Sequence, residues 1–216
     1  MTFSELQILL DISKGNEVDV LEKHTKEIDI GYIFVDSEDG QCWLFDKNGK
    51  IADIKKITTL CEDYIKKDIK KIVIPKSVKS IGDWAFAYCR SLKSIEIPNS
   101  VKSIGDDVFL GCKSLKSVEI PESVKSIGDQ TFSHCTSLTS IKIPSSVENI
   151  RDGIFWNCKS LKSIEIPDTV KSIGYGAFYD CTSLEEVIFK DKTIDEVKAM
   201  DGYPWGIEDE AIIKCS

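Results

Sequence analysis

Residues 74–96 read IPKSVKSIGDWAFAYCRSLKSIE, and this unit of 23 residues occurs five times in succession. The last copy, residues 166–188, reads IPDTVKSIGYGAFYDCTSLEEVI, and no copy contains an insertion or a deletion. The five copies begin at Ile74, Ile97, Ile120, Ile143 and Ile166. A fixed period of this length is typical of solenoids, in which each copy forms one coil and stacks on its neighbours.

Seven apolar positions are constant within the repeat, apart from valine for isoleucine at 118 and 187 and Phe189 at the end of the last ladder. In the first copy they are Val78, Ile81, Phe86, Cys89, Leu92, Ile95 and Ile97. Because side chains alternate between the two faces of a strand, Leu92, Ile95 and Ile97 should point inward and Ser94 and Glu96 outward. The repeat therefore predicts a parallel sheet to which each coil contributes one short strand.

The pattern IPxSVxSIGxxxFxxCxSLxSIxI resembles the BspA-type leucine-rich repeat, and the resemblance covers 115 of the 216 residues. It implies an α/β repeat fold: a right-handed leucine-rich-repeat solenoid with a parallel sheet on its concave side. Proteins of this kind occur in bacteria, protists and viruses, often at cell surfaces in adhesion or host interaction. The resemblance implies no catalysis.

The residues before the repeats predict a small α+β element over residues 1–70. Ser4 and Gln7 form a capping-box start for a short helix. Residues 31–54 alternate apolar and polar side chains around two turn signals, Asp39-Gly40 and Asn48-Gly49, and predict a three-stranded meander. Residues 55–67 have helical spacing and predict a helix docked on the first coil. We expect this element to be a cap or a second domain beside the solenoid of residues 71–189.

The period ends at Phe189, and residues 190–216 predict a C-terminal cap made of a helix and a strand. Thr193 and Glu196 form a second capping box, which predicts a short helix that ends at Gly202. Residues 211–215 predict a last strand. The last coil of a solenoid exposes apolar side chains, so Trp205 is expected to cover that end.

A glycine follows the SVKSI segment in four of the five copies, at Gly82, Gly105, Gly128 and Gly174. These glycines are expected to allow a positive φ at a corner of the coil. Arg151 takes the place of the glycine in the fourth copy, which predicts a locally different turn there.

The charge distribution argues against several classes of function. The chain has a net charge of −8, but residues 71–189 are neutral and the two flanks carry the excess acid. No lysine- and arginine-rich face is evident, which argues against direct nucleic-acid binding. No apolar run approaches the ~18 residues of a spanning helix, and the first residues lack a basic leader. The sequence predicts a cytoplasmic protein, or a secreted or surface protein if an export signal has been removed.

Five of the eight cysteines occupy one repeat position and form a ladder: Cys89, Cys112, Cys135, Cys158 and Cys181. Cysteines stacked on strands about 4.8 Å apart do not easily reach disulfide geometry, so a buried ladder of thiols is the favoured interpretation. Disulfide pairing of some of them and metal binding are the weaker alternatives. There is no C-x-x-C pair, phosphate-binding glycine loop or G-x-S-x-G motif, so neither a cofactor nor an enzyme is predicted.

Two surfaces are candidate binding sites for a partner protein. The first is the outward sheet face, formed by Ser94, Glu96, Ser117, Glu119, Ser140, Lys142, Ser163, Glu165 and Glu186. The second consists of positions near the constant phenylalanine that vary between coils: Trp84, Tyr88, Leu110, His134, Trp156 and Tyr179. Aromatic residues are enriched in binding hot spots. Alternatively, these aromatic side chains fill gaps between the coils.

The sequence therefore favours a non-catalytic protein-protein interaction module of unidentified partner. Two other hypotheses remain open. One is an intracellular inhibitor or effector, of viral or host-directed origin, that binds and blocks an enzyme. The other is a bacterial surface adhesin.

Overall fold

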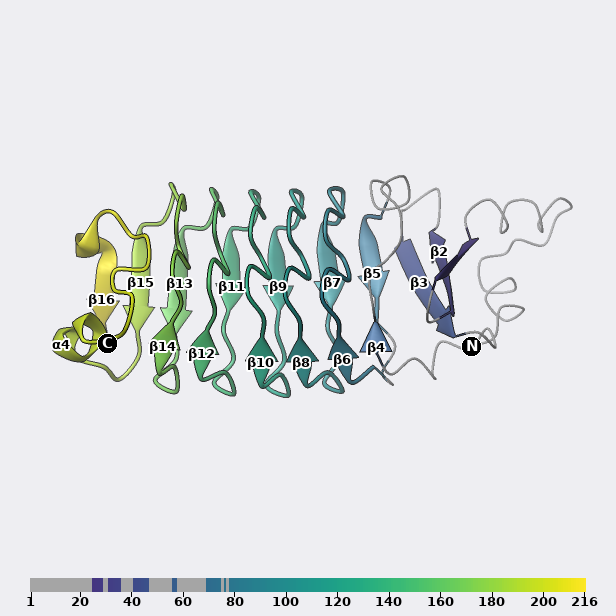
Figure 1. Ribbon diagram of the computed structural model, residues 1–216. Helices are drawn as coiled ribbons and strands as arrows, with labels where there is room; N and C mark the ends of the chain where they lie inside the picture. Colours follow the sequence, from purple (N-terminus) through teal and green to yellow (C-terminus); the bar gives the residue numbers. More distant parts are fainter. Residues whose placement is uncertain are drawn as a thin grey trace, which may run out of the picture.

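The computed structural model describes residues 25–28, 31–35, 41–46, 56–57, 69–74, 76 and 78–216. The repeats stack as coils along one axis (Figure 1). We number these coils one to five, after the copies that begin at Ile74, Ile97, Ile120, Ile143 and Ile166.

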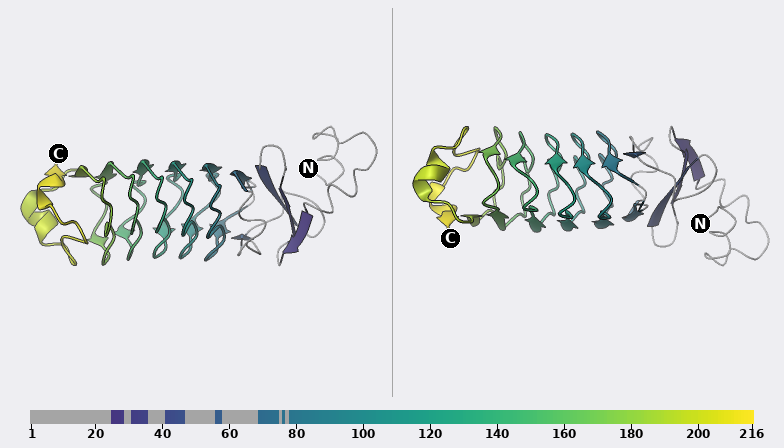
Figure 2. Two further views of the ribbon diagram at one scale, coloured as in Figure 1. Left: turned by 90° about the horizontal axis from the view of Figure 1, so that it is seen from above. Right: turned by 90° about the horizontal axis from the view of Figure 1, so that it is seen from below.

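One strand of each coil joins a ten-stranded sheet, which we call the main sheet. Its strands, in spatial order, are β1 (Thr25–Ile28), β2 (Gly31–Val35), β3 (Gln41–Asp46), β5 (Lys71–Val73), β7 (Ser94–Glu96), β9 (Ser117–Glu119), β11 (Ser140–Lys142), β13 (Ser163–Ile166), β15 (Glu186–Phe189) and β16 (Ile213–Cys215). From β3 onward neighbouring strands are parallel. β1 to β3 and β16 lie at opposite ends of the stack in all views (Figure 2).

A second, shorter strand of each coil forms another face, which we call the second face. A four-stranded sheet there contains β4 (Lys56–Ile57), β6 (Ser80–Ile81), β8 (Ser103–Ile104) and β10 (Ser126–Ile127). A separate two-stranded sheet contains β12 (Asn149–Ile150) and β14 (Ser172–Ile173). All of these pairs are parallel, but β10 and β12 do not pair with each other.

The core lies between the two faces and consists of ladders of identical side chains. The seven constant positions of the first copy are all buried, which confirms the inward assignment. The rings of Phe86, Phe109, Phe132, Phe155 and Phe178 stack along the axis, with centroids 5.6, 5.4, 5.9 and 5.8 Å apart. Phe109, Phe132 and Phe155 have a stacked ring on each side, and Phe86 and Phe178 have one on one side. Burying one phenylalanine side chain stabilises a fold by about 1.5–3 kcal/mol.

The glycines after the second-face strands are needed for close approach between coils and not for positive φ. None of the four predicted glycines has a left-handed φ, so that prediction is wrong. A Cβ atom on Gly105 would lie 2.2 Å from Oδ1 and 2.8 Å from N of Asp83 in the coil before. On Gly128 it would lie 2.2 Å from Oδ1 and 2.5 Å from N of Asp106. Glycine is required because the backbone of one coil touches the next.

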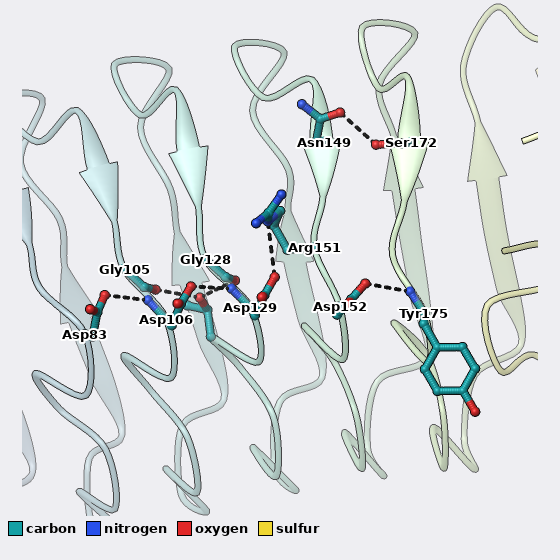
Figure 3. Close-up of polar contacts among 11 residues, drawn as sticks. Asp83, Gly105, Asp106, Gly128, Asp129, Asn149, Arg151, Asp152, Ser172 and Tyr175 are labelled. Carbon is teal, nitrogen blue, oxygen red and sulfur yellow. Dashed lines mark hydrogen bonds and ion pairs between the residues drawn. The ribbon is translucent and has the colours of Figure 1, made fainter. Parts of the chain in front are cut away.

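A row of aspartates follows these glycines and connects successive coils by hydrogen bonds (Figure 3). The N–H of Asp106 donates to Oδ1 of Asp83 at 2.9 Å, and the N–H of Asp129 donates to Oδ1 of Asp106 at 2.8 Å. The N–H of Tyr175 donates to Oδ1 of Asp152 at 2.8 Å. One bond of the series is missing among the described residues, that between Asp152 and Asp129.

Arg151 explains both the missing bond and the missing strand pair. Its Cβ occupies the place where the other coils need glycine, so coils three and four cannot approach as closely there. Nε of Arg151 instead donates to Oδ1 of Asp129 at 3.1 Å. Coils three and four remain hydrogen-bonded to each other next to this opening, because the N–H of Gln130 donates to O of Asp152 at 2.9 Å. The outer turn after Arg151 has the same left-handed positions as in the other coils, at Gly153 and Asn157, so the different turn predicted there is wrong. What changes at Arg151 is the pairing of β10 with β12.

The N-terminal strands differ in part from the prediction. β1, β2 and β3 form an antiparallel meander, in which β2 and β3 are the hairpin predicted around Asp39-Gly40. β1 lies in a segment for which no element was predicted. The helix expected over residues 55–67 is wrong at Lys56–Ile57, which forms β4 because Ile57 pairs in register with Ile81 of β6. The helix expected after Ser4 and the turn at Asn48-Gly49 lie outside the described residues.

The C-terminal end has a helix and a strand as predicted, but the helix ends at Lys198 and not at Gly202, and the strand begins at Ile213 and not at residue 211. α4 (Ile194–Lys198) begins with the capping box of Thr193 and Glu196, and a 3-10 turn, η2 (Glu210–Ile212), precedes β16. Trp205 is buried, with its ring centroid 5.7 Å from that of Phe189. Its carbonyl accepts from the N–H of Phe178 at 3.1 Å, as the next coil would do. Trp205 therefore closes the core at the last coil.

Replacing Gly128 by alanine separates close approach from backbone conformation as the reason for glycine. Alanine at a glycine of ordinary φ normally stabilises a protein by about 0.4–1 kcal/mol. Here its Cβ would collide with Asp106, so we expect Gly128→Ala to destabilise the fold by about 1–3 kcal/mol. Chemical denaturation measures the difference. An increase in stability would contradict the close-approach account.

Candidate functional site

Each coil contains an outer turn, which covers residues 83–88, 106–111, 129–134, 152–157 or 175–180. Two residues of every outer turn have left-handed φ, at the second and sixth positions, as at Trp84 (59°) and Tyr88 (62°) in coil one. Their N–H groups donate to the next coil: that of Trp84 to Asp106 O at 2.9 Å and that of Tyr88 to Leu110 O at 2.6 Å. The turn thus continues the hydrogen bonding between coils at positions that a bulky residue seldom occupies.

The outer turns of coils four and five carry a pair of exposed aromatic side chains. Trp156 is 37% exposed and Tyr179 is 52% exposed. Their ring centroids lie 5.0 Å apart with the ring planes tilted by 58°. The two rings therefore touch each other and also face solvent. We call them the aromatic pair.

Two left-handed glycines lie beside the aromatic pair. Gly153 (φ 56°) and Gly176 (φ 61°) each lie three residues before one of the rings. A Cβ atom on Gly153 would lie 3.6 Å from Cε3 of Trp156, and one on Gly176 would lie 3.8 Å from the same atom. A Cβ atom at either position would be in ordinary van der Waals contact with the Trp156 ring, so the ring lies close to both glycines. Coil one has the reverse arrangement, with the large Trp84 followed by the small, buried Ala87.

The structure does not bring all predicted aromatic positions together. Trp84 and Tyr88 are exposed but lie on coil one, three coils from Trp156, which is about 14 Å at the spacing of β-strands. His134 is exposed on coil three, where its Nδ1 lies 2.9 Å from Oγ of Ser133. Leu110 is buried and does not contribute to the exposed surface.

The outward face of the main sheet has the predicted ladders of polar side chains. All nine predicted residues of this face are exposed. Two ion pairs border it, Lys142–Glu122 at 4.0 Å and Lys190–Glu165 at 3.4 Å. Glu96 and Glu119 are direct neighbours on adjacent strands, an arrangement that places like charges side by side.

The cysteine ladder consists of free thiols, which are buried at the first four positions and half-buried at Cys181. The thiols of Cys112, Cys135 and Cys158 donate to the carbonyls of Phe86, Phe109 and Phe132 at 3.3, 3.2 and 3.2 Å. Burial raises the pKa of the Cys135 thiol to about 12. The reactive thiolate is therefore scarce at neutral pH, so the ladder supports packing and not nucleophilic chemistry.

Two residues near Arg151 were not singled out from the sequence. Asn149 replaces the serine of the other coils, and its Oδ1 accepts from Oγ of Ser172 at 2.7 Å. Tyr175 follows Gly174 and is strongly exposed. Both residues differ from those at the same repeat position in the other coils and point outward. The same feature identified Trp156 in the sequence.

Comparison with known proteins agrees with the coil geometry. Residues 61–185 and 148–199 match the BspA type leucine rich repeat region, in six copies. The chain belongs to the BspA-type leucine-rich repeat family. The matched residues begin before the first copy and include β5, which pairs with β7 of coil one.

Among solved structures, the chain is similar to a leucine-rich repeat protein of T. pallidum, TpLRR, with 34% identity and a TM-score of 0.55 over 61% of each chain. It is also similar to a leucine-rich repeat protein of Eubacterium ventriosum, with 22% identity and a TM-score of 0.57 over 72% of this chain and 39% of the other. The pneumococcal vaccine antigen PcpA has the same fold, at 20% identity and a TM-score of 0.54, over 77% and 50%. The chain thus spans about three fifths or less of these relatives.

A search of curated proteins found no match. In the part of the chain that the structure describes, no helix has the length and apolar character needed to cross a membrane. The same residues contain no group of three or more His, Cys, Asp or Glu side chains placed to hold a metal ion.

The charge of Asp107 provides a pH-dependent test of the outer turns. Burial, followed by the nearby carboxylates Asp106, Asp129 and Asp83, raises the pKa of Asp107. An acid with a raised pKa in the folded state destabilises the fold once it ionises. We therefore expect Asp107→Asn to stabilise the protein at neutral pH, since asparagine also tolerates left-handed φ. The gain should shrink as the pH falls through the pKa of Asp107.

Urea denaturation over a range of pH measures this dependence. Glu148→Gln is the control, because it should change the stability at neutral pH in the opposite direction. The hydrogen bond and charge of Lys171 lower the pKa of Glu148, so the ionised form is favoured in the fold. Glu148→Gln should lower stability at neutral pH and lose its effect at acid pH. Parallel pH profiles for the two variants would contradict the assignment.

Proposed function

We propose that this chain is a non-catalytic protein-binding module whose main contact is the aromatic pair. The observation that carries the proposal is that Trp156 and Tyr179 remain exposed while the constant phenylalanines are buried. Tryptophan and tyrosine are the residues most enriched in binding hot spots. Solenoids expose long surfaces of this kind to partners.

The packing of Trp156 supports a binding role as well as a structural one. Its ring lies beside Gly153 and Gly176 and touches Tyr179, and these neighbours limit the positions of the ring before a partner binds. A side chain that is already ordered loses less conformational entropy on binding. The ion pair of Lys159 and Asp180, 3.5 Å apart, gives the neighbouring surface polar groups of both signs.

A photo-reactive benzoylphenylalanine at residue 179 would identify the partner by cross-linking, and purified components would then give a Kd. Trp156→Ala and Tyr179→Ala should each weaken binding by roughly tenfold or more, as hot-spot truncations do. The matched control is the double variant Trp84→Ala with Tyr88→Ala, which removes two exposed aromatic side chains from coil one and should have little effect on the Kd.

Two further measurements distinguish contact from gap filling. Thermal unfolding of each variant reports any loss of packing, and Glu119→Lys tests the main-sheet face as the competing surface. If Glu119→Lys abolishes binding while the Trp156 variant binds normally, the partner contacts the sheet face and the aromatic-pair proposal is wrong.

A further inference from the structure

The loops that lead into the main sheet lie along one edge of the stack (Figure 1), which we call the loop edge. It consists of residues 90–93, 113–116, 136–139, 159–162 and 182–185 in coils one to five, followed by residues 208–211 before β16. The N–H of Lys116 donates to Lys93 O at 3.4 Å, and that of Thr139 donates to Lys116 O at 3.0 Å, so the loops stack directly. Ile213 of β16 pairs with Val187 of β15, which places residues 208–211 beyond the loop of coil five.

The charge on the loop edge changes from positive to negative along the stack. The first and last residues of each loop are Arg90 and Lys93 in coil one, Lys113 and Lys116 in coil two, Thr136 and Thr139 in coil three, Lys159 and Lys162 in coil four, and Thr182 and Glu185 in coil five. Glu208, Asp209 and Glu210 follow in the C-terminal cap. These side chains are exposed, apart from the half-buried Thr136. The loop edge therefore has a basic end on coils one and two and an acidic end on coil five and the cap.

The basic end carries four cations without counter-charges beside them. Arg90, Lys93, Lys113 and Lys116 form no ion pair with a described residue. Residues 86–94 and 109–117, which surround them in the chain, contain no aspartate or glutamate. The carboxylates of these coils lie elsewhere: Asp83, Asp106 and Asp107 at the start of the outer turn, and Glu96 and Glu119 three residues further along the main sheet than the lysines, about 10 Å away.

The acidic end has more carboxylates than cations. The exposed carboxylates there are Glu185, Glu186, Glu208, Asp209 and Glu210. The nearby cations are Lys162, one coil before Glu185, and Lys214, whose Nζ donates to Ala211 O at 3.0 Å. Lys159 is already paired with Asp180 at 3.5 Å. The acidic end therefore keeps a net negative charge.

A second copy of the chain, placed antiparallel along the loop edge, matches these charges coil by coil. A two-fold axis between coils three and four brings coil one opposite the cap, coil two opposite coil five, and coil three opposite coil four. The cations of coils one and two then face carboxylates, and the two lysines of coil four face the neutral Thr136 and Thr139. Two-fold interfaces are self-complementary in this way, because every contact occurs twice.

A second copy also explains more of the loop edge than another acidic partner does. An unrelated acidic protein would contact the basic end and leave the acidic end without a role. A long polyanion would extend along the stack to the acidic end and be repelled there. From coil one to the cap the edge is five coil spacings long, about 24 Å, and its exposed side chains are charged or polar, so the contact is of the weak and salt-dependent kind.

We propose that this protein forms an antiparallel two-fold dimer through the loop edge, in which the basic end of each copy binds the acidic end of the other. The residues that carry this inference are separate from Trp156 and Tyr179. It therefore does not rest on the proposed function, and either can fail without the other.

Sedimentation velocity of the full chain over a range of concentrations tests for the dimer. At low salt the protein should change from monomer to dimer as its concentration rises, and about 1 M salt should return it to monomer, because the Debye length is then about 3 Å. A protein that stays monomeric at low salt up to about 1 mM would overturn the proposal. So would a series of species larger than a dimer, because it would indicate end-to-end association.

Charge reversal at each end tests the pairing of the two ends. Lys93→Glu with Lys116→Glu makes the whole edge acidic, and Glu185→Lys with Glu208→Lys makes it basic. Each double variant alone should dimerise with a Kd raised roughly tenfold or more, because like charges then face each other. An equimolar mixture of the two variants should form a heterodimer, since an acidic edge then meets a basic one.

The matched control is Lys79→Glu with Lys102→Glu, which makes the same change in net charge on the second face of coils one and two. It should dimerise like the unmodified protein, and thermal unfolding should show that all three double variants remain folded. If the mixture of reversed variants stays monomeric, or the control loses dimerisation as they do, the pairing of the two ends is wrong.

A capped hexaglutamate peptide distinguishes the remaining occupant of the basic end. If the unmodified protein stays monomeric but binds this peptide, and Lys93→Glu with Lys116→Glu abolishes that binding, the basic end serves an acidic segment of another protein and the dimer proposal is overturned. In the dimer, the peptide should instead compete with self-association and raise the dimer Kd.

Discussion

The close approach of neighbouring coils at the second face is the constraint on which the rest of the stack depends. Gly105, Gly128 and Gly174 leave no room for a Cβ atom against the backbone of the coil before. This contact allows one aspartate to accept the N–H of the next, and allows the short second-face strands to pair. Stacked phenylalanines and the hydrogen bonds of the outer turn maintain a similar spacing elsewhere in each coil.

Variation between the outer turns leaves this spacing intact. In the outer turn a large residue at the left-handed position goes with a small residue three positions later, as in Trp84 and Ala87. Where glycine occupies the left-handed position, an exposed aromatic residue follows three positions later, as with Gly153 and Trp156. Arg151 is different, because it violates the spacing itself. A protein that keeps such a residue gives up local strand pairing, which is common at functional sites.

The sequence predicted the core well because each core position is repeated and its alternation has a direct physical meaning. It failed at Gly105 and Gly128, because a glycine needed for close contact with another coil cannot be distinguished from one needed for positive φ without knowing that coil's backbone. It also failed at Lys56–Ile57, where pairing with β6 overrides a helical pattern. The aromatic candidates were found individually, but their separation onto coil one and onto coils four and five, and the burial of Leu110, depend on the path of the outer turn.

The central claim is that a side chain at residue 151 keeps coils three and four apart on the second face. A crystal structure of Arg151→Gly tests it most directly. We expect β10 and β12 to pair, so that the second face becomes one continuous sheet, and the N–H of Asp152 to donate to Oδ1 of Asp129. If β10 and β12 stay separate without the arginine, Cβ collision does not cause the opening and the account is contradicted.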